Sequence, residues 1–193
     1  MTVARWLPIV SVGAIVVARI AELTTKRETL RGSIRENLTL RLFIVVGTLV
    51  WVGAIIEFFW RDERLRWGSY VPGLICGGLS FWIRREAIVA LGRFWSLHIE
   101  IRANHEFVHS GPFRWMRHPT YFSMILELVA IGLILNAVVA LAIGLALFAP
   151  ILYWRINLEE AALVEKFGDR YRSYQHATPV LFPYKWKIKN EPG

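Results

Sequence analysis

The chain has 193 residues, 55% of them hydrophobic, and a formal net charge of +8 at pH 7. Its mean hydropathy of +0.40 excludes an ordinary soluble domain, in which about 45–50% of residues are apolar even when glycine is counted. The positive charges lie between apolar segments, which favours contact with anionic lipid head groups over nucleic-acid binding. The single cysteine, Cys76, excludes a disulfide framework and a cysteine-rich metal site.

The first half of the sequence predicts three membrane helices, because apolar segments of about 17–25 residues can cross a bilayer. The apolar runs cover residues 6–23, 38–60 and 70–83, and the third helix is expected to continue towards residue 91. Arg19 and Glu22 lie three residues apart in the first run, so they share a helix face and can pair. This run lacks a small-residue cleavage site, so we expect it to stay as a spanning helix.

The second half predicts a helical hairpin. Residues 92–119 mix histidines, aromatics and charges, whereas residues 121–148 are almost wholly apolar and too long for one spanning helix. Asn136 marks the expected turn, which gives a hairpin over residues 121–149. Pro150 is expected to kink the second helix, which continues to Phe167, and Gly168 is a helix-ending residue.

Together these elements predict an all-α, polytopic membrane protein with about five transmembrane helices in a single domain, residues 1–193. Residues 1–91 supply three helices, and residues 92–193 form the core that carries the site. Most Lys and Arg residues fall in residues 24–41, 84–118 and the C-terminal tail. The positive-inside rule therefore places these segments, and the site, on the cytoplasmic side.

Two polar clusters bracket the hairpin. The stretch from Arg114 to Tyr121 precedes it, and Arg155, Glu159 and Glu160 follow it. A charge at mid-bilayer costs about 2.5–3.5 kcal/mol on insertion scales, so such charges indicate function. We expect the two clusters to form one site. Glu127, inside the hairpin, is expected to pack rather than to catalyse.

The spacing of the histidines does not predict a metal site. His98 and His105 are seven residues apart and His109 follows four residues later, with no His-Glu-x-x-His pattern. Neither a Gly-x-Ser-x-Gly nor a Walker motif occurs, so hydrolase and nucleotidase activities have no support. We expect no bound metal.

Four spaced motifs occur in the second half: His105-x-x-Val108-x-x-Gly111-x-Phe113, Arg117-His118-Pro119-Thr120-Tyr121, Arg155-x-x-x-Glu159-Glu160-x-x-Leu163 and Phe167-Gly168-x-x-Tyr171-x-x-Tyr174. Their order and separation resemble the isoprenylcysteine carboxyl methyltransferase family over about residues 95–180. The resemblance implies an integral membrane enzyme of the bacterial or archaeal inner (plasma) membrane that uses S-adenosylmethionine in a cytoplasm-facing pocket. Phe113 stands where the family usually has tyrosine.

The resemblance also implies roles for individual residues. Arg155 would be the catalytic residue that faces the methyl acceptor. The expected cofactor-binding residues are His98, His105, Glu106, Phe107, Val108, Phe113, His118, Pro119, Thr120, Tyr121 and Glu159. Aromatic rings suit the adenine and the sulfonium, and an arginine can hold a carboxylate through two hydrogen bonds.

Several alternatives stay open at this stage. The acceptor is expected to be a prenylated or otherwise lipophilic carboxylate, and a small lipophilic acid fits as well as a prenylated protein because eukaryotic members have more helices. The protein could instead methylate a phospholipid amine, or act as a transporter or scaffold. Arg155 and Glu159 are four residues apart and could form only a structural ion pair. Membrane lipids are expected partners, and the oligomeric state is open.

Overall fold

The computed structural model describes residues 3–25, 33–34, 37–62, 64–95, 100–101 and 108–182. These residues are almost wholly helical, which confirms the all-α prediction, and their strands are one antiparallel pair of two residues each, β1 (Ser33–Ile34) and β2 (Glu100–Ile101). The 3-10 turns are η1 (Gly92–Phe94) and η2 (Gly111–Arg114). The α-helices are α1 (Val3–Thr24), α2 (Leu38–Trp60), α3 (Trp67–Leu91), α4 (Pro119–Ile134), α5 (Val138–Phe167) and α6 (Asp169–Ala177).

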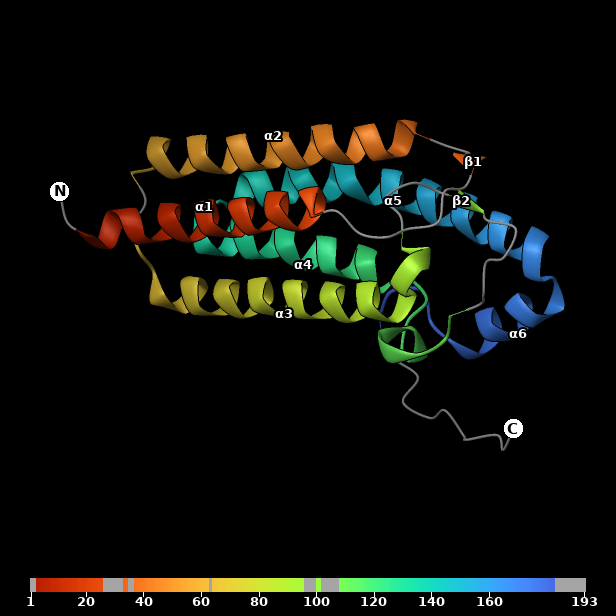
Figure 1. Cartoon of the computed structure of the whole chain (residues 1–193). Helices are drawn as coiled ribbons and strands as arrows, with labels where there is room; N and C mark the ends of the chain where they lie inside the picture. Colours follow the sequence, from red (N-terminus) through yellow and green to blue (C-terminus); the bar gives the residue numbers. More distant parts are fainter. Residues whose placement is uncertain are drawn as a thin grey trace.

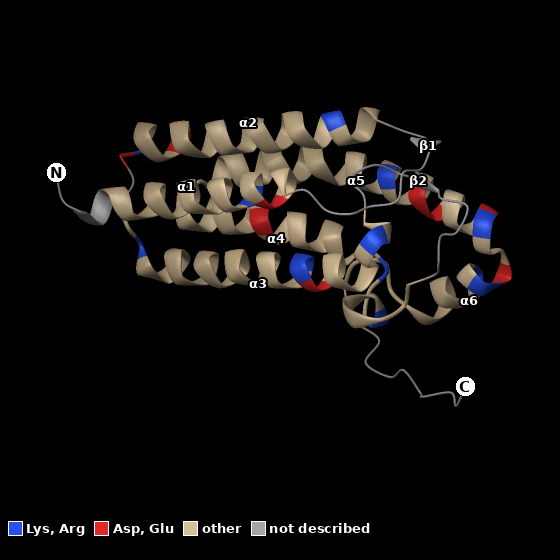
Figure 2. Cartoon of the chain, viewed as in Figure 1, with Lys and Arg blue, Asp and Glu red and all other residues tan. Residues whose placement is uncertain are grey.

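The five long helices form a bundle in which α4 is central, because it contacts α1, α2, α3 and α5. Figure 1 shows that α1 and α3 end, and α2 and α4 begin, at the same end of the bundle, where α6 also lies. Many of the described charged residues lie at this end (Figure 2). The helix ends that border the segments predicted to share one side of the membrane therefore lie together, and which side that end faces stays a prediction.

Three of the described helices are long and apolar enough to cross a membrane, over Trp6–Thr24, Leu38–Trp60 and Val138–Phe167. Large apolar side chains such as Leu49, Val52 and Ile56 of α2 are exposed, as expected for helices that face lipid. Helix α4 is apolar but has only 16 residues, and α3 includes the charged run 84–86 near its end. The predicted membrane protein is confirmed, whereas the number of crossings, about five, stays a prediction.

The bundle packs through apolar side chains and close helix contacts. One buried cluster joins α1 to α2, α3 and the hairpin turn, and a second joins α2, α4 and α5 around Phe43 and Phe148. A side chain placed at Gly73 of α3 would lie 2.7 Å from a side-chain carbon of Ile134. Small residues let membrane helices approach closely, so Gly73 lets α3 lie directly against α4.

The hairpin turns where the sequence predicts it. Asn136 adopts a positive φ of 52°, and the N–H of Ala137 donates to the carbonyl of Gly132 at 2.8 Å. Helix α5 starts at Val138 without a side-chain cap from its own N-cap residue. Instead Glu57 of α2 accepts hydrogen bonds from the N–H groups of Val139 and Ala140. These bonds satisfy part of the exposed helix end and join α2 to the start of α5.

The second arm of the hairpin is longer than the membrane portion predicted over residues 121–149. Helix α5 continues through Pro150 as one element of 30 residues. It ends, as predicted, at Gly168, which has a φ of 56°. This continuity carries Arg155 and Glu159 out towards the charged end of the bundle, next to the first turn of α4.

Candidate active site

The structure describes eight of the twelve residues expected at the site. His98, His105, Glu106 and Phe107 lie outside the described residues. Val108 is half-buried in the loop before η2, and Phe113 is half-buried within η2. The six that remain lie at the start of α4 or on the second half of α5; they are His118, Pro119, Thr120, Tyr121, Arg155 and Glu159.

Backbone hydrogen bonds fix the approach to α4. The N–H of Arg117 donates to the carbonyl of Pro179 at 2.9 Å, and the N–H of His118 donates to Val180 at 3.0 Å. Pro119 is the first residue of the helix, a position that suits proline because the missing N–H would have no helical partner there. The segment that follows α6 therefore orients His118, whose side chain is almost fully buried.

The two polar clusters meet at the hydroxyl of Tyr121. This hydroxyl donates to Oε2 of Glu159 at 2.6 Å and accepts from Nε of Arg155 at 2.9 Å. The phenol therefore lies between the two α5 side chains and relates the position of one to the other. The contact confirms that the residues before and after the hairpin come together, and their roles stay a prediction.

His118 lies between the two neighbouring carboxylates of α5. Its Nε2 is 3.0 Å from Oε1 of Glu160, and its Nδ1 is 3.7 Å from Oε2 of Glu159. The His118 ring stacks on Tyr121, with centroids 5.4 Å apart and an interplanar angle of 17°. The side chain of Glu159 is 33% exposed, against 13% for Glu160. Glu159 is therefore the more accessible of the two carboxylates.

Besides its contact with His118, Glu160 takes part in a set of contacts that supports this arrangement. Arg117 donates from Nε to Oε1 of Glu160 at 2.7 Å and from Nη1 to the carbonyls of Gln175 and Thr178. The side-chain amide of Gln175 donates to Oε2 of the same carboxylate at 2.8 Å. These bonds join the loop before α4, α5 and α6. Arg117 and Glu160 are motif residues, but the motif spacing did not reveal that they pair.

Helix α6 contributes two tyrosines to the same end, Tyr171, which is buried, and Tyr174, which is half-buried. The hydroxyl of Tyr174 donates to the carbonyl of Phe113, and Tyr171 packs beside Tyr174 with ring centroids 5.9 Å apart. Burial raises the pKa of both phenols above the ordinary value of 10.0 because it disfavours the charged form. Both tyrosines thus stay neutral, and Tyr174 holds η2, which carries Phe113, against α6.

Arg155 is buried at the inner edge of the site, with 4% of its surface exposed. Its Nη1 donates to the hydroxyl of Thr39 in α2 at 2.8 Å, and its guanidinium lies 5.7 Å from the ring centroid of Phe43 and 5.9 Å from that of Tyr121. Sequence reasoning missed Thr39, since an isolated threonine at the start of an apolar run gives no signal. Helix α2 therefore takes part in positioning the arginine.

The formal charges of the two arginines and two glutamates at the site cancel. Arg117 and Arg155 oppose Glu159 and Glu160, with the buried His118 between the carboxylates. Among the described residues, no group of three or more His, Cys, Asp or Glu side chains could hold a metal ion. The arrangement offers an accessible carboxylate, an aromatic face and a buried guanidinium, which suit a cationic or hydroxyl-bearing ligand beside an anionic one.

Known relatives share this part of the chain. The sequence profile of the isoprenylcysteine carboxyl methyltransferase (ICMT) family matches residues 74–165. The chain is 36% identical over 83 residues to the uncharacterized protein YpbQ of Bacillus subtilis, a match that covers 43% of this chain and 49% of the relative. It is 29% identical over 120 residues to the cobalt-zinc-cadmium resistance protein CzcN of Cupriavidus metallidurans, covering 61% and 54%.

A longer match joins the chain to a plant enzyme. It is 28% identical over 149 residues to protein-S-isoprenylcysteine O-methyltransferase B of Arabidopsis thaliana, covering 74% of this chain and 73% of the relative. The chain spans about half the length of the Bacillus and Cupriavidus relatives.

The fold is also that of a solved structure of the eukaryotic intramembrane Ras methyltransferase ICMT, with a TM-score of 0.69 and 20% identity. That likeness covers 94% of this chain and 68% of the other. The profile match includes α4 and most of α5, the two helices that bring His118, Tyr121, Arg155 and Glu159 together. The chain is therefore similar to the isoprenylcysteine carboxyl methyltransferase family over residues 74–165, just under half of its length.

Proposed function

We propose that this protein is an S-adenosylmethionine-dependent methyltransferase that esterifies the carboxylate of a lipophilic substrate at the membrane. The observation that carries the proposal is the hydroxyl of Tyr121, which contacts both Glu159 and Arg155. It joins a carboxylate suited to a cofactor to a guanidinium suited to an anionic acceptor. The match of the family profile to residues 74–165 and the similarity to a relative named protein-S-isoprenylcysteine O-methyltransferase B support the proposal.

The described residues fit S-adenosylmethionine by their chemistry. Glu159 is partly exposed and can accept hydrogen bonds from ribose hydroxyls or an ammonium group. The face of Tyr121 suits a sulfonium cation. Phe113, Val108, Pro119 and Thr120 lie at the same end of the fold. The proposal assigns them to the wall around the cofactor.

When bound, the cofactor would supply an electrophilic methyl group, and an ionised carboxylate needs no general base to accept it. The work of the protein is therefore to align the acceptor and to exclude water, and orientation can contribute roughly 7–11 kcal/mol to a barrier reduction. Arg155 orients the acceptor, and Glu159 and His118 orient the cofactor. Tyr121 contacts both Arg155 and Glu159 and so fixes the position of one relative to the other.

The position of Arg155 favours a carboxylate over an amine as the acceptor. A buried guanidinium attracts an anion and repels a protonated amine, which would in addition have to lose a proton before methylation. In the structure Nε and Nη1 of Arg155 already donate to Tyr121 and Thr39. A carboxylate held through two bonds would therefore engage another edge of the guanidinium or displace one of these hydroxyls.

Apolar side chains of α2 and α5 pack beside Tyr121, so we propose that the acceptor carries a lipid-like chain. Phe43, Phe148 and Leu152 form part of the buried cluster beside Tyr121, close to the arginine. The excess of Lys and Arg in residues 24–41, 84–118 and the C-terminal tail supports the proposal that the site faces the cytoplasm from a bacterial or archaeal inner membrane. A prenylated protein and a small lipophilic acid both meet these requirements.

Binding of radiolabelled S-adenosylmethionine to purified protein tests the cofactor site. Glu159→Gln and His118→Ala should each abolish binding, whereas Glu165→Gln, on the exposed face of the same helix, should bind like the wild type. Unaltered affinity in both site variants would reject the site. Incubation with lipid extract then identifies the product, because a methyl ester is lost in mild base and a methylamine is retained.

A further inference from the structure

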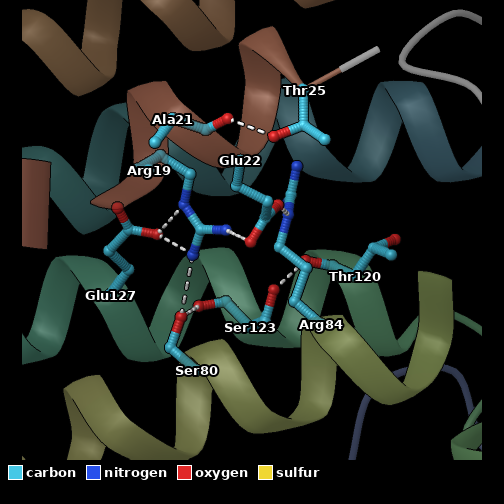
Figure 3. A network of polar contacts seen from close by, with 9 residues as sticks. All are labelled: Arg19, Ala21, Glu22, Thr25, Ser80, Arg84, Thr120, Ser123 and Glu127. Atoms are coloured by element: carbon cyan, nitrogen blue, oxygen red, sulfur yellow. Dashed lines mark hydrogen bonds and ion pairs between the residues drawn. The ribbon is translucent and has the colours of Figure 1, made fainter. Parts of the chain in front are cut away.

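A second group of buried charges lies inside the bundle, away from the candidate site. Arg19 of α1 donates from Nε to Glu127 of α4 and from Nη1 to Glu22, each at 2.8 Å. Arg84 of α3 donates from Nε to the other oxygen of Glu22 at 2.6 Å. Figure 3 shows these side chains meeting between the three helices. The predicted Arg19–Glu22 pair is confirmed, and the structure extends it to a network of four charges.

The four charged side chains of the network are enclosed by the bundle. The two arginines and two glutamates balance in charge, and each side chain is at most 15% exposed. A charge inside a bundle of membrane helices is tolerated when it is paired within the protein. The network is therefore suited to holding the helices together rather than to binding a ligand.

Uncharged groups extend the network towards the start of α4. Nη2 of Arg19 donates to Ser80 of α3 at 3.3 Å, and the Ser80 hydroxyl donates to the backbone carbonyl of Ser123 at 2.8 Å. The Ser123 hydroxyl then donates to the carbonyl of Thr120 at 2.7 Å. Both serines are fully buried. A continuous path of hydrogen bonds thus runs from α1 through α3 to the first turn of α4 (Figure 3).

The same turn of α4 carries Tyr121, whose hydroxyl contacts Glu159 and Arg155. Glu127 is six residues further along, or about 9 Å at the rise of an α-helix. A helix moves as a stiff rod over that distance. A rotation of α4 at Ser123 or Glu127 would therefore shift the Tyr121 hydroxyl relative to both α5 side chains.

We propose that the Arg19 network is a positioning device that sets the rotation of α4, and through it the place of Tyr121 in the site. Arg19, Glu127 and Ser80 act through α4 and do not touch the reactants. The inference rests on the proposed function for its kinetic consequence, and it predicts a structural consequence that does not depend on catalysis.

Ser80→Ala tests the device without removing a charge, so the test avoids the folding risk of Arg19 or Glu127 variants. The matched control is Ser11→Ala. The Ser11 hydroxyl also joins α1 to α3, through the Tyr70 hydroxyl at 2.8 Å, but neither residue hydrogen-bonds to α4 in the described contacts. Both variants remove one hydroxyl between the same two helices, and one of them alone breaks the path to Thr120.

Two readouts in lipid nanodiscs decide the outcome. Ser80→Ala should lower kcat about tenfold with a KM for the acceptor within about twofold of wild type, as expected when alignment is lost. It should also speed hydrogen–deuterium exchange in peptides that cover residues 119–127. Ser11→Ala should change neither quantity by more than about twofold. Equal effects of the two variants, or a loss of melting temperature with unchanged kcat and exchange, would overturn the proposal.

The exchange measurement separates this proposal from the proposed function. If the wild type binds no S-adenosylmethionine, the methyltransferase proposal fails while faster exchange in Ser80→Ala still supports the coupling of α1 and α3 to α4. If the wild type is an active methyltransferase and exchange at residues 119–127 is the same in all three proteins, the positioning device alone is rejected.

Discussion

Two buried charge clusters, similar in composition, differ in how completely their members are enclosed. In the Arg19 network the glutamates Glu22 and Glu127 are 15% and 11% exposed, whereas Glu159 at the candidate site is 33% exposed. The first cluster lies between α1, α3 and α4, and the second lies at the charged end where α4 meets α5. An enclosed charge cluster is suited to holding helices together, whereas a partly exposed carboxylate can contact a ligand.

Removal of one charge from the closed cluster should have the largest effect on stability. Glu127→Gln leaves Arg19 buried with one ionic partner fewer, and breaking a buried pair in this way costs about 3–5 kcal/mol. Thermal unfolding in nanodiscs measures the loss, with Glu165→Gln as the exposed control. Replacing both partners, as Arg19→Met with Glu127→Met, should recover part of the stability. If Glu127→Gln melts at the same temperature as the wild type, the network does not hold the helices together.

Arg155→Lys should have the next largest effect, on activity rather than on stability. Lysine keeps the charge but lacks the planar fork that contacts Tyr121 and Thr39 together. We expect kcat/KM to fall about a hundredfold, equivalent to about 2.7 kcal/mol. Arg114→Lys, at an exposed arginine of η2, is the control. Retention of full activity by Arg155→Lys would mean that charge alone suffices at the acceptor.

Thr39→Val should have a smaller effect on activity than Arg155→Lys. The substitution keeps the shape of a fully buried side chain but removes the acceptor of one Arg155 hydrogen bond, at a cost of about 1 kcal/mol. A fall of about fivefold in kcat is expected, with S-adenosylmethionine affinity unchanged. Thr39→Ser keeps the hydroxyl and should stay near wild type. If Val and Ser variants behave alike, the hydroxyl has no role in positioning Arg155.

The smallest effect concerns the alkaline limit of stability. The pKa values of Tyr171 and Tyr174 are raised in the folded protein by burial, so an unfolded chain ionises these phenols first. Their contribution to stability is therefore complete below pH about 10 and declines as the pH rises through and above that value. Tyr174→Phe should lessen the decline in melting temperature between pH 9 and 11, while Tyr153→Phe, at an exposed tyrosine, should not. Equal slopes in the two variants would contradict this reading.

Local patterns predicted the helices well because each depends on a short segment. The apolar run over residues 38–60 coincides with α2, and Asn136 and Gly168 end helices where their tolerance of positive φ allows it. The meeting of Tyr121 with Arg155 and Glu159 was expected because the two polar clusters lie on either side of the apolar hairpin.

Contacts between distant helices had no such signal. Thr39 reaches Arg155 across 116 residues of sequence, Arg19 reaches Glu127 across 108, and Glu57 caps α5 from a neighbouring helix. Each contact depends on how far a helix is rotated about its axis. That rotation is set by packing, as where the absence of a side chain at Gly73 leaves room for Ile134. Packing between helices cannot be predicted from one segment alone.

The sequence by itself determined that this protein is a helical membrane protein and where its charged groups lie along the chain, because hydropathy and turn chemistry act within about twenty residues. The tertiary structure alone decided which charges close on each other and which stay accessible. The reason is that burial in a bundle depends on the simultaneous fit of several helices, and a carboxylate such as Glu127 or Glu159 acquires its surroundings only when that fit is made.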